Sequence, residues 1–264
     1  MRFAELRNVA VCIALAMTGA FVAWAQNAAE SIQANPNRPT VTSTATLAPV
    51  GYLQFENGGL YAAGTPGMAA QLSLTQVTRL AVHPRLEFFS QWQPWARSSP
   101  GGDNEPGGVV LGLRTVALTG QGLHPTLSFG YLRTLYSGRT PSLDVGSAFQ
   151  GALAMLNIGL QKTHIYSNFI VNEQKESGVR RAQWGQTLCF SRDFGRASIY
   201  GELWHFTQPL SRGNAAGNLW ALTYSARPNL VFDGGFNRGL TASSTSWEAF
   251  TGVTYLLPQR LWQR

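Results

Sequence analysis

The stretch HPRLEF at residues 83–88 returns as HPTLSF at 124–129 and as RPNLVF at 227–232. In each copy a basic residue and a proline precede one polar residue, and two apolar residues follow with a single position between them. In a strand, the two apolar side chains of such a pair lie on one face, whereas a helix would place them on different faces. Because proline lacks an N–H and is tolerated at turns and strand starts, each copy predicts a turn that opens a strand.

The overall composition indicates a non-aqueous neighbour for part of the surface. The chain has 264 residues, of which 44% are hydrophobic and only 12% are charged, whereas about 25% charged residues are usual in a soluble protein. The mean hydropathy is only −0.07, and beyond the N-terminal leader no apolar run of about 18 residues offers a membrane-spanning helix. Any membrane embedding must therefore use alternating strands.

The N-terminus has the pattern of an export signal. Arg2 and Arg7 precede an apolar run from Val9 to Val22, and the run ends in the small-x-small sequence of residues 23–25. We expect residues 1–25 to be a cleaved signal peptide, with an uncleaved N-terminal helix as the alternative. Residues 26–49 are polar and rich in Ala, Asn, Pro and Thr, so they predict a strap without regular structure. The folded domain is expected to cover residues 50–264.

Cysteine content and charge exclude other classes of protein. The predicted mature chain retains only Cys189, so an internal disulfide is impossible. Loss of Arg2, Arg7 and Glu5 with the leader changes the formal charge from +7 to +6, and nearly all of the positive charge is arginine. The arginines are scattered over turns and loops without a basic helix, so we do not expect a nucleic-acid partner. Phosphate-bearing lipid headgroups are the expected anionic partner instead.

The rest of the chain divides into segments that alternate in hydrophobicity and are bounded by turn residues, which is typical of a transmembrane β-barrel. We count twelve segments, at residues 51–61, 70–82, 85–95, 107–118, 125–137, 148–160, 163–173, 181–191, 197–207, 217–226, 229–238 and 246–257. One face of the segments is apolar. It comprises Leu72, Leu74, Leu80, Val82, Leu86, Phe88, Trp92, Val109, Leu111, Leu113, Leu127, Phe129, Tyr131, Trp184, Leu188, Phe190, Trp220, Leu222, Tyr224, Phe232, Phe236, Trp247, Val253, Tyr255 and Leu257.

The connections alternate between short and long. Short links at residues 83–84, 120–124, 162–163, 193–196 and 227–228 are interleaved with longer ones at 96–106, 138–147, 174–180, 208–216 and 239–245. Outer-membrane barrels have short periplasmic turns and longer external loops. The sequence therefore predicts a closed all-β antiparallel barrel of about twelve strands in a Gram-negative outer membrane. A soluble β-sandwich is the alternative, but its outer faces would need more charge than this chain has.

The polar face of the strands is expected to line the lumen. The lumen-lining and transport candidates are Glu56, Arg79, Glu87, Arg114, Glu202, Asp233, Asn237 and Glu248, with Gln91, His164, Asn168 and Asn172 on the same face. Buried carboxylates need partners, so we expect Arg79 and Arg114 to neutralise some of them. Twelve strands enclose a space between the filled interior of eight strands and the aqueous channel of sixteen. A structural charge network and a narrow solute path both remain open readings.

Catalytic and metal chemistry have little support in the sequence. The four histidines lie at turns or strand ends, without an evident nucleophile and carboxylate beside them. No His or Cys pairs occur at ligand spacing, so neither a metal nor another cofactor is predicted. Aromatic residues near strand ends are expected to form interfacial girdles, and Arg133 is placed to contact lipid phosphate. The expected girdle residues are Trp92, Trp95, Tyr131, Tyr136, Trp204, Trp247 and Tyr255.

NRPTVT at residues 37–42 and APVGYLQFENG at 48–58 resemble the N-terminal signature of the outer-membrane barrels named for the MetA pathway of phenol degradation. The resemblance implies a single barrel and passage of small, often aromatic or hydrophobic compounds. Residues 252–257 also resemble the final-strand signal read by the barrel-insertion machinery, although PQRLWQR follows.

The sequence thus favours a non-enzymatic channel or transporter for passive passage of small solutes. Its expected partners are membrane lipid, a small-molecule solute and the insertion machinery. A structural or adhesive barrel with an occluded lumen is one alternative, and a barrel lipid hydrolase is another.

Overall fold

The computed structural model describes residues 32–99, 102–139, 143, 148–210 and 213–262. The predicted signal peptide and the first residues of the predicted strap lie outside the described residues. Among the residues it describes, no helix is long and apolar enough to cross a membrane.

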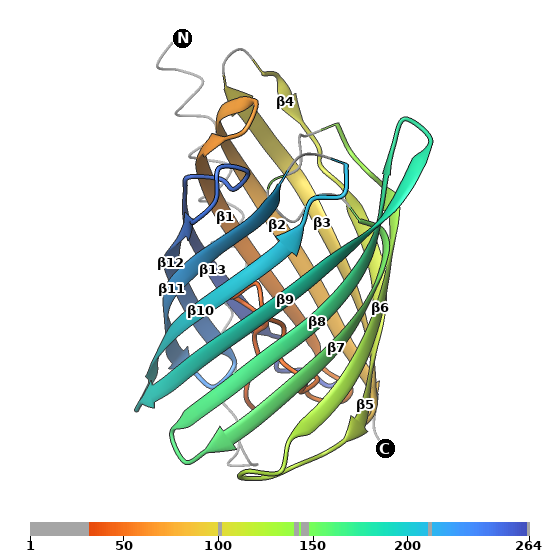
Figure 1. The fold of residues 1–264 in the computed structure, drawn as a ribbon. Helices are drawn as coiled ribbons and strands as arrows, with labels where there is room; N and C mark the ends of the chain where they lie inside the picture. Colours follow the sequence, from red (N-terminus) through yellow and green to blue (C-terminus); the bar gives the residue numbers. More distant parts are fainter. Residues whose placement is uncertain (1–31, 100–101, 140–142, 144–147, 211–212, 263–264) are drawn as a thin grey trace, which may run out of the picture. The chain divides into compact units, whose positions relative to one another are not determined.

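Strands form nearly all of the regular structure in the described chain (Figure 1). They are β1 (Leu53–Thr65), β2 (Met68–His83), β3 (Leu86–Ser99), β4 (Asn104–Glu105), β5 (Val109–Leu118), β6 (Thr126–Tyr136), β7 (Ala148–Leu160), β8 (Thr163–Glu176), β9 (Val179–Phe194), β10 (Ala197–Thr207), β11 (Asn214–Arg227), β12 (Leu230–Gly239) and β13 (Trp247–Leu256). The two-residue β4 pairs with the outer end of β3.

The other twelve strands form one closed antiparallel ring. Each pairs with its neighbours along the chain, and β1 closes the ring by pairing with β13 from Gln54↔Leu256 to Ala63↔Trp247. Closure leaves no unpaired sheet edge, so the backbone groups of the wall are satisfied within the protein. The fold predicted from the sequence, a closed all-β barrel of twelve strands, is confirmed.

The three proline repeats lie at one end of the barrel. Pro84 and Pro228 occupy two-residue links, and Pro125 immediately precedes β6. The strand ends that the longer connections join lie at the opposite end, between β3 and β5, β6 and β7, β10 and β11, and β12 and β13. By the rule that outer-membrane barrels have short periplasmic turns, the proline end is periplasmic and the other end is external.

One predicted connection is wrong. Residues 174–180 were expected to form a long loop, but β8 continues to Glu176 and β9 begins at Val179. Only Ser177 and Gly178 join the two strands. Both linking residues have positive φ, 47° and 85°, as a two-residue type I′ hairpin turn requires. The strand ends there are mostly polar on both faces, so the alternation that reveals a strand in the sequence is missing.

The predicted apolar face points outward. Most of its members are exposed although they are large, for example Trp220 (52%), Leu222 (50%) and Phe190 (50%). Contiguous exposed apolar surface on this scale marks contact with lipid. Trp204 is an exception among the predicted girdle residues, because it is only 4% exposed. It lies two positions after Glu202, so strand alternation turns both side chains inward.

Candidate functional site

The N-terminal strap lies inside the barrel. Residues 32–49, red to orange in Figure 1, form no named strand. Their polar groups instead bond to inward-facing side chains of strands from different sides of the ring, including β1, β3, β8, β10 and β12. Strap and wall together form the candidate site.

Arg79 of β2 occupies the centre of a buried charge network. Its guanidinium lies 3.0 Å from Oε1 of Glu56 and 3.0 Å from Oε2 of Glu87, and all three residues are at most 1% exposed. Arg114 approaches Glu87 at 3.7 Å. The pairing of Arg79 and Arg114 with carboxylates is the one the sequence predicts. Arg79 also donates hydrogen bonds to the backbone carbonyls of Asn35 and Thr46, which ties the network to the strap.

Three carboxylates accept hydrogen bonds from backbone N–H groups of the strap. Glu56 accepts from Asn37 at 3.1 Å, and Glu87 accepts from Ala48 at 2.6 Å. Glu202 accepts from the N–H groups of Val41 and Thr42 at 2.9 and 2.7 Å, and from the Thr42 hydroxyl at 2.7 Å. These carboxylates therefore accept hydrogen bonds from strap N–H groups that are not paired in a helix or a sheet.

Two wall amides and a serine hold the middle of the strap. Asn168 accepts a hydrogen bond from the N–H of Ser43 at 2.6 Å and donates to the carbonyl of Ser43 at 2.9 Å. Asn157 accepts from the N–H of Ala45 at 2.9 Å, and Ser128 donates to the Ala45 carbonyl. The paired contacts to one strap residue resemble a single rung of a β-ladder and fix the depth of the strap in the lumen.

Arg38 of the strap fits into a gap in the wall. Gly58 of β1 and Gly252 of β13 are register partners, and a Cβ atom on either would overlap the Arg38 side chain. The missing side chains let Arg38 reach Asp233 of β12, with Nη2 to Oδ1 at 3.2 Å. Asp233 was predicted as a lumen residue from the sequence, but its partner was not, because the glycine notch is recognisable only once β1 and β13 are paired.

A small apolar cluster lies within the same lumen. Ile170 of β8, Trp204 and Phe206 of β10 and Ala215 of β11 are buried together, with Val41 of the strap and Leu153 of β7 packed against them. The rings of Trp204 and Phe206 lie over their register partners on the neighbouring strands, Gly217 and Gly185. A Cβ atom at either glycine would overlap the ring. Large inward aromatics thus stand against small wall positions, a pairing that alternation alone does not predict.

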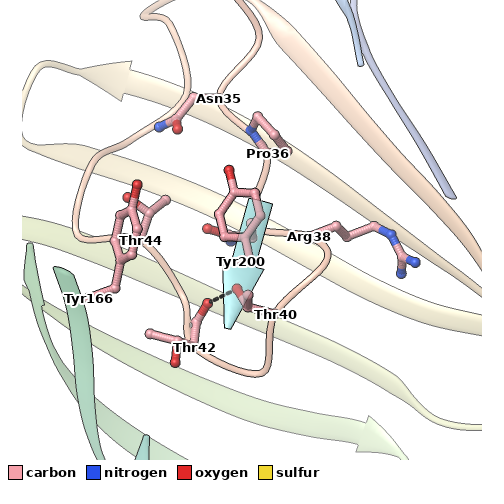
Figure 2. Close-up of a pocket in the computed structure, with 9 residues that line it drawn as sticks. Asn35, Pro36, Arg38, Thr40, Thr42, Thr44, Tyr166 and Tyr200 are labelled. Carbon is pink, nitrogen blue, oxygen red and sulfur yellow. Dashed lines mark hydrogen bonds between the residues drawn. The ribbon is translucent and has the colours of Figure 1, made fainter. Parts of the chain in front are cut away.

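The strap leaves a cavity of about 90 Å³ beside it. Figure 2 shows Tyr166 of β8 and Tyr200 of β10 beside the strap segment from Asn35 to Thr44. The Thr40 hydroxyl closes a local turn on the Thr42 carbonyl at 2.7 Å. The polar lining of this cavity suits water or a small polar group.

The last two of the eight candidates, Asn237 and Glu248, lie nearer the external end. Asn237 accepts a hydrogen bond from the Trp204 indole N–H at 2.9 Å and donates to Glu248 at 2.8 Å. Asn237 is 2% exposed, whereas Glu248 is partly exposed. Seven of the eight candidates are therefore buried, and Glu248 is the partly exposed one.

One histidine has a partner that the sequence did not reveal. His164 Nε2 lies 3.1 Å from Asp193 Oδ2, and Ser198 donates to Asp193 Oδ1 at 2.6 Å. The sequence analysis found no histidine with both a nucleophile and a carboxylate beside it; the structure gives His164 a carboxylate partner, which the neighbouring strand β9 supplies. In this arrangement the carboxylate lies between the other two groups, so the serine bonds to Asp193 and not to the imidazole that would activate it. Among the described residues, no group of three His, Cys, Asp or Glu side chains could hold a metal ion.

Closed ring, outward apolar face and polar interior together define a transmembrane β-barrel of the outer-membrane type. The comparison with solved structures agrees on the fold. The chain is similar to the COG4313 outer-membrane channel from Pseudomonas putida F1, with 12% identity, a TM-score of 0.58, and coverage of 81% of this chain and 98% of that one.

Two porin structures are similar to it as well. The NanC porin matches with 11% identity and a TM-score of 0.57, over 76% of this chain and 98% of the porin. The KdgM porin matches with 12% identity and a TM-score of 0.52, over the same shares of the two chains. No family model matches the sequence, and no curated protein matches it.

Proposed function

We propose that the protein is an outer-membrane channel for passive passage of small solutes, and that the strap holds it closed in the conformation described here. The observation that carries the proposal is the way the strap is bound. Its contacts with the wall are mainly hydrogen bonds to Glu56, Glu87, Glu202, Asn168 and Asp233. Water can replace such bonds, because a hydrogen bond contributes only about 0.5–1.5 kcal/mol net, or about 1.5–3 kcal/mol when one group is charged.

The lumen wall suits a solute with both polar and apolar parts. Once Val41 leaves, Trp204 and Phe206 would face the vacated space, with Glu202 and Asn168 on neighbouring positions of the wall. An aromatic platform beside polar groups is a common arrangement for binding small organic molecules. We propose small, partly hydrophobic or aromatic compounds as the solute class, with the eight candidate polar residues lining the path.

A reducible disulfide between the strap and the barrel wall provides the sharpest test, because it locks the strap in place reversibly. The hydroxyls of Thr42 on the strap and Thr187 on β9 are 2.7 Å apart, so the double variant Thr42→Cys/Thr187→Cys places two sulfurs in bonding range. Native Cys189 is removed with Cys189→Ser to prevent mispairing. Single-channel conductance is then measured in planar bilayers before and after reduction, so that each molecule is its own control.

We expect conductance to fall at least tenfold when the disulfide forms and to return on reduction. Deletion of residues 32–48 should give larger and more frequent conducting steps than the intact chain. Equal conductance of the oxidised and reduced forms, or a deletion variant that stays silent and admits no dye into liposomes, would overturn the proposal.

The second candidate function is a structural envelope barrel with a permanently occluded lumen. The observation in its favour is the complete burial of the network around Arg79, which anchors the strap at two carbonyls. If the strap is a permanent plug, the intact chain never conducts, and reduction of the Thr42→Cys/Thr187→Cys disulfide does not change the conductance. The conductance experiment therefore separates the two functions.

A further inference from the structure

A cluster of cationic side chains lies on the outer surface of the barrel at its external end. Arg133 of β6, Lys175 of β8 and Arg180 of β9 gather around the ring of Phe149 of β7. Their charged groups lie 3.8, 5.5 and 5.3 Å from the ring centroid. Three strands thus bring three cations to one aromatic ring.

Strand alternation shows that these cations face outward. Arg133 is two positions after Tyr131, and Arg180 is four positions before Trp184; both aromatics are exposed, at 43% and 45%. Lys175 shares the face of Phe169, which is 45% exposed and lies 5.7 Å from Trp184 between ring centroids. The cations therefore stand directly beyond the aromatic part of the lipid-facing surface.

A hydrogen-bond network holds part of the cluster in position. Gln150 accepts hydrogen bonds from Arg133 at 3.2 Å and from the Tyr131 hydroxyl at 2.9 Å, and donates to Glu173 at 2.6 Å. Glu173 in turn accepts from Arg180 at 3.0 Å. The side chains are thus ordered before any ligand arrives, which lowers the entropic cost of binding.

The cluster has a surplus of positive charge. Three cations face one carboxylate, Glu173, so the formal charge of the group is +2. Glu176 does not change this balance on the outer face, because it shares the strand parity of the inward, buried Gln174. Arginine and lysine side chains in this arrangement are suited to phosphate oxygens.

We propose that this cluster binds the phosphate-bearing headgroup of an outer-leaflet lipid, whose acyl chains lie along Tyr131, Phe169 and Trp184. Charge complementarity selects the headgroup, and the adjoining exposed aromatics accept the chains. The site is independent of the lumen and of the proposed channel activity.

The test uses the full chain purified in detergent and titrated with a bis-phosphorylated glucosamine lipid in mixed micelles. The variant Arg133→Ala/Lys175→Ala/Arg180→Ala should raise the apparent Kd at least tenfold, which corresponds to about 1.4 kcal/mol. Arg85→Ala/Arg196→Ala/Arg227→Ala removes the same charge from exposed periplasmic positions and is the matched control. It should bind as the wild type does.

Two further arms identify the ligand. The same lipid without its phosphates should bind at least tenfold more weakly, and inorganic phosphate at equal concentration should not displace the phosphorylated lipid. Equal binding by the two triple variants, equal binding of the dephosphorylated lipid, or displacement by inorganic phosphate would each overturn the assignment. Should the triple variant fail to fold, Lys175→Glu, a single change at an exposed position, must weaken binding for the proposal to stand.

Discussion

Replacement of Arg79 by methionine removes the charge at the centre of the lumen network while keeping a long unbranched side chain. Arg79 donates to Glu87 through Nε and Nη2 and to Glu56 through Nη1, each at 3.0 Å, and none of its surface is exposed. Three charge-assisted bonds at about 1.5–3 kcal/mol each set an upper limit of roughly 5–9 kcal/mol. Repacking, water entry and the remaining contact of Arg114 with Glu87 reduce this value.

We therefore expect Arg79→Met to lower the free energy of unfolding by about 3–5 kcal/mol, the usual cost of leaving one partner of a buried ion pair without the other. The measurement is the urea midpoint of the refolded barrel in lipid vesicles, followed by tryptophan fluorescence at equilibrium. The slope of the transition should not change, because the surface exposed on unfolding is the same.

The triple variant Glu56→Gln/Arg79→Met/Glu87→Gln is the control. It removes all three charges together, so it should recover most of the lost stability. A loss below about 1 kcal/mol in Arg79→Met, or a triple variant no more stable than the single one, would refute the view that this network is a dry, mutually dependent unit.

Three other perturbations have defined outcomes. Gly58→Val fills the notch that Arg38 occupies and should raise conductance toward that of the strap deletion; Gly59→Val, where a Cβ would be 3.7 Å from its nearest neighbour, should leave conductance unchanged. Phe129→Arg, at a position 46% exposed to lipid, should destabilise the inserted barrel by about 2–4 kcal/mol if it lies near the bilayer midplane, as measured by the urea midpoint against Phe129→Leu. Asp233→Asn removes a lumen carboxylate and should lower cation over anion selectivity in reversal-potential measurements on the strap-deleted barrel; unchanged selectivity would count against Asp233 lining the path.

The fold was predictable because a barrel wall is specified by a local rule. Lipid on one side and a polar interior on the other impose a two-residue period, and that period is visible in each strand without knowledge of its partner. The rule failed where both environments are aqueous, at the tips of β8 and β9. The same two-residue rule, applied to Glu202, corrects the placement of Trp204. Trp204 lies two positions after the inward-facing Glu202 and therefore also points inward.

The inward direction of Glu56, Arg79, Glu87, Glu202 and Asp233 follows from the sequence by the same rule, and so does the expectation that arginines pair with carboxylates. The sequence did not show that the strap supplies N–H groups to Glu56, Glu87 and Glu202, or that Arg38 pairs with Asp233. Those contacts join residues up to 195 positions apart.

The amino-acid sequence by itself determined which face of most strands meets lipid, because a single residue shift would turn the whole apolar row into the lumen. Only the tertiary structure decided what fills the lumen and which cations meet on the outer rim. Both depend on strand register and ring closure, which bring distant residues together and leave no periodic trace in the chain.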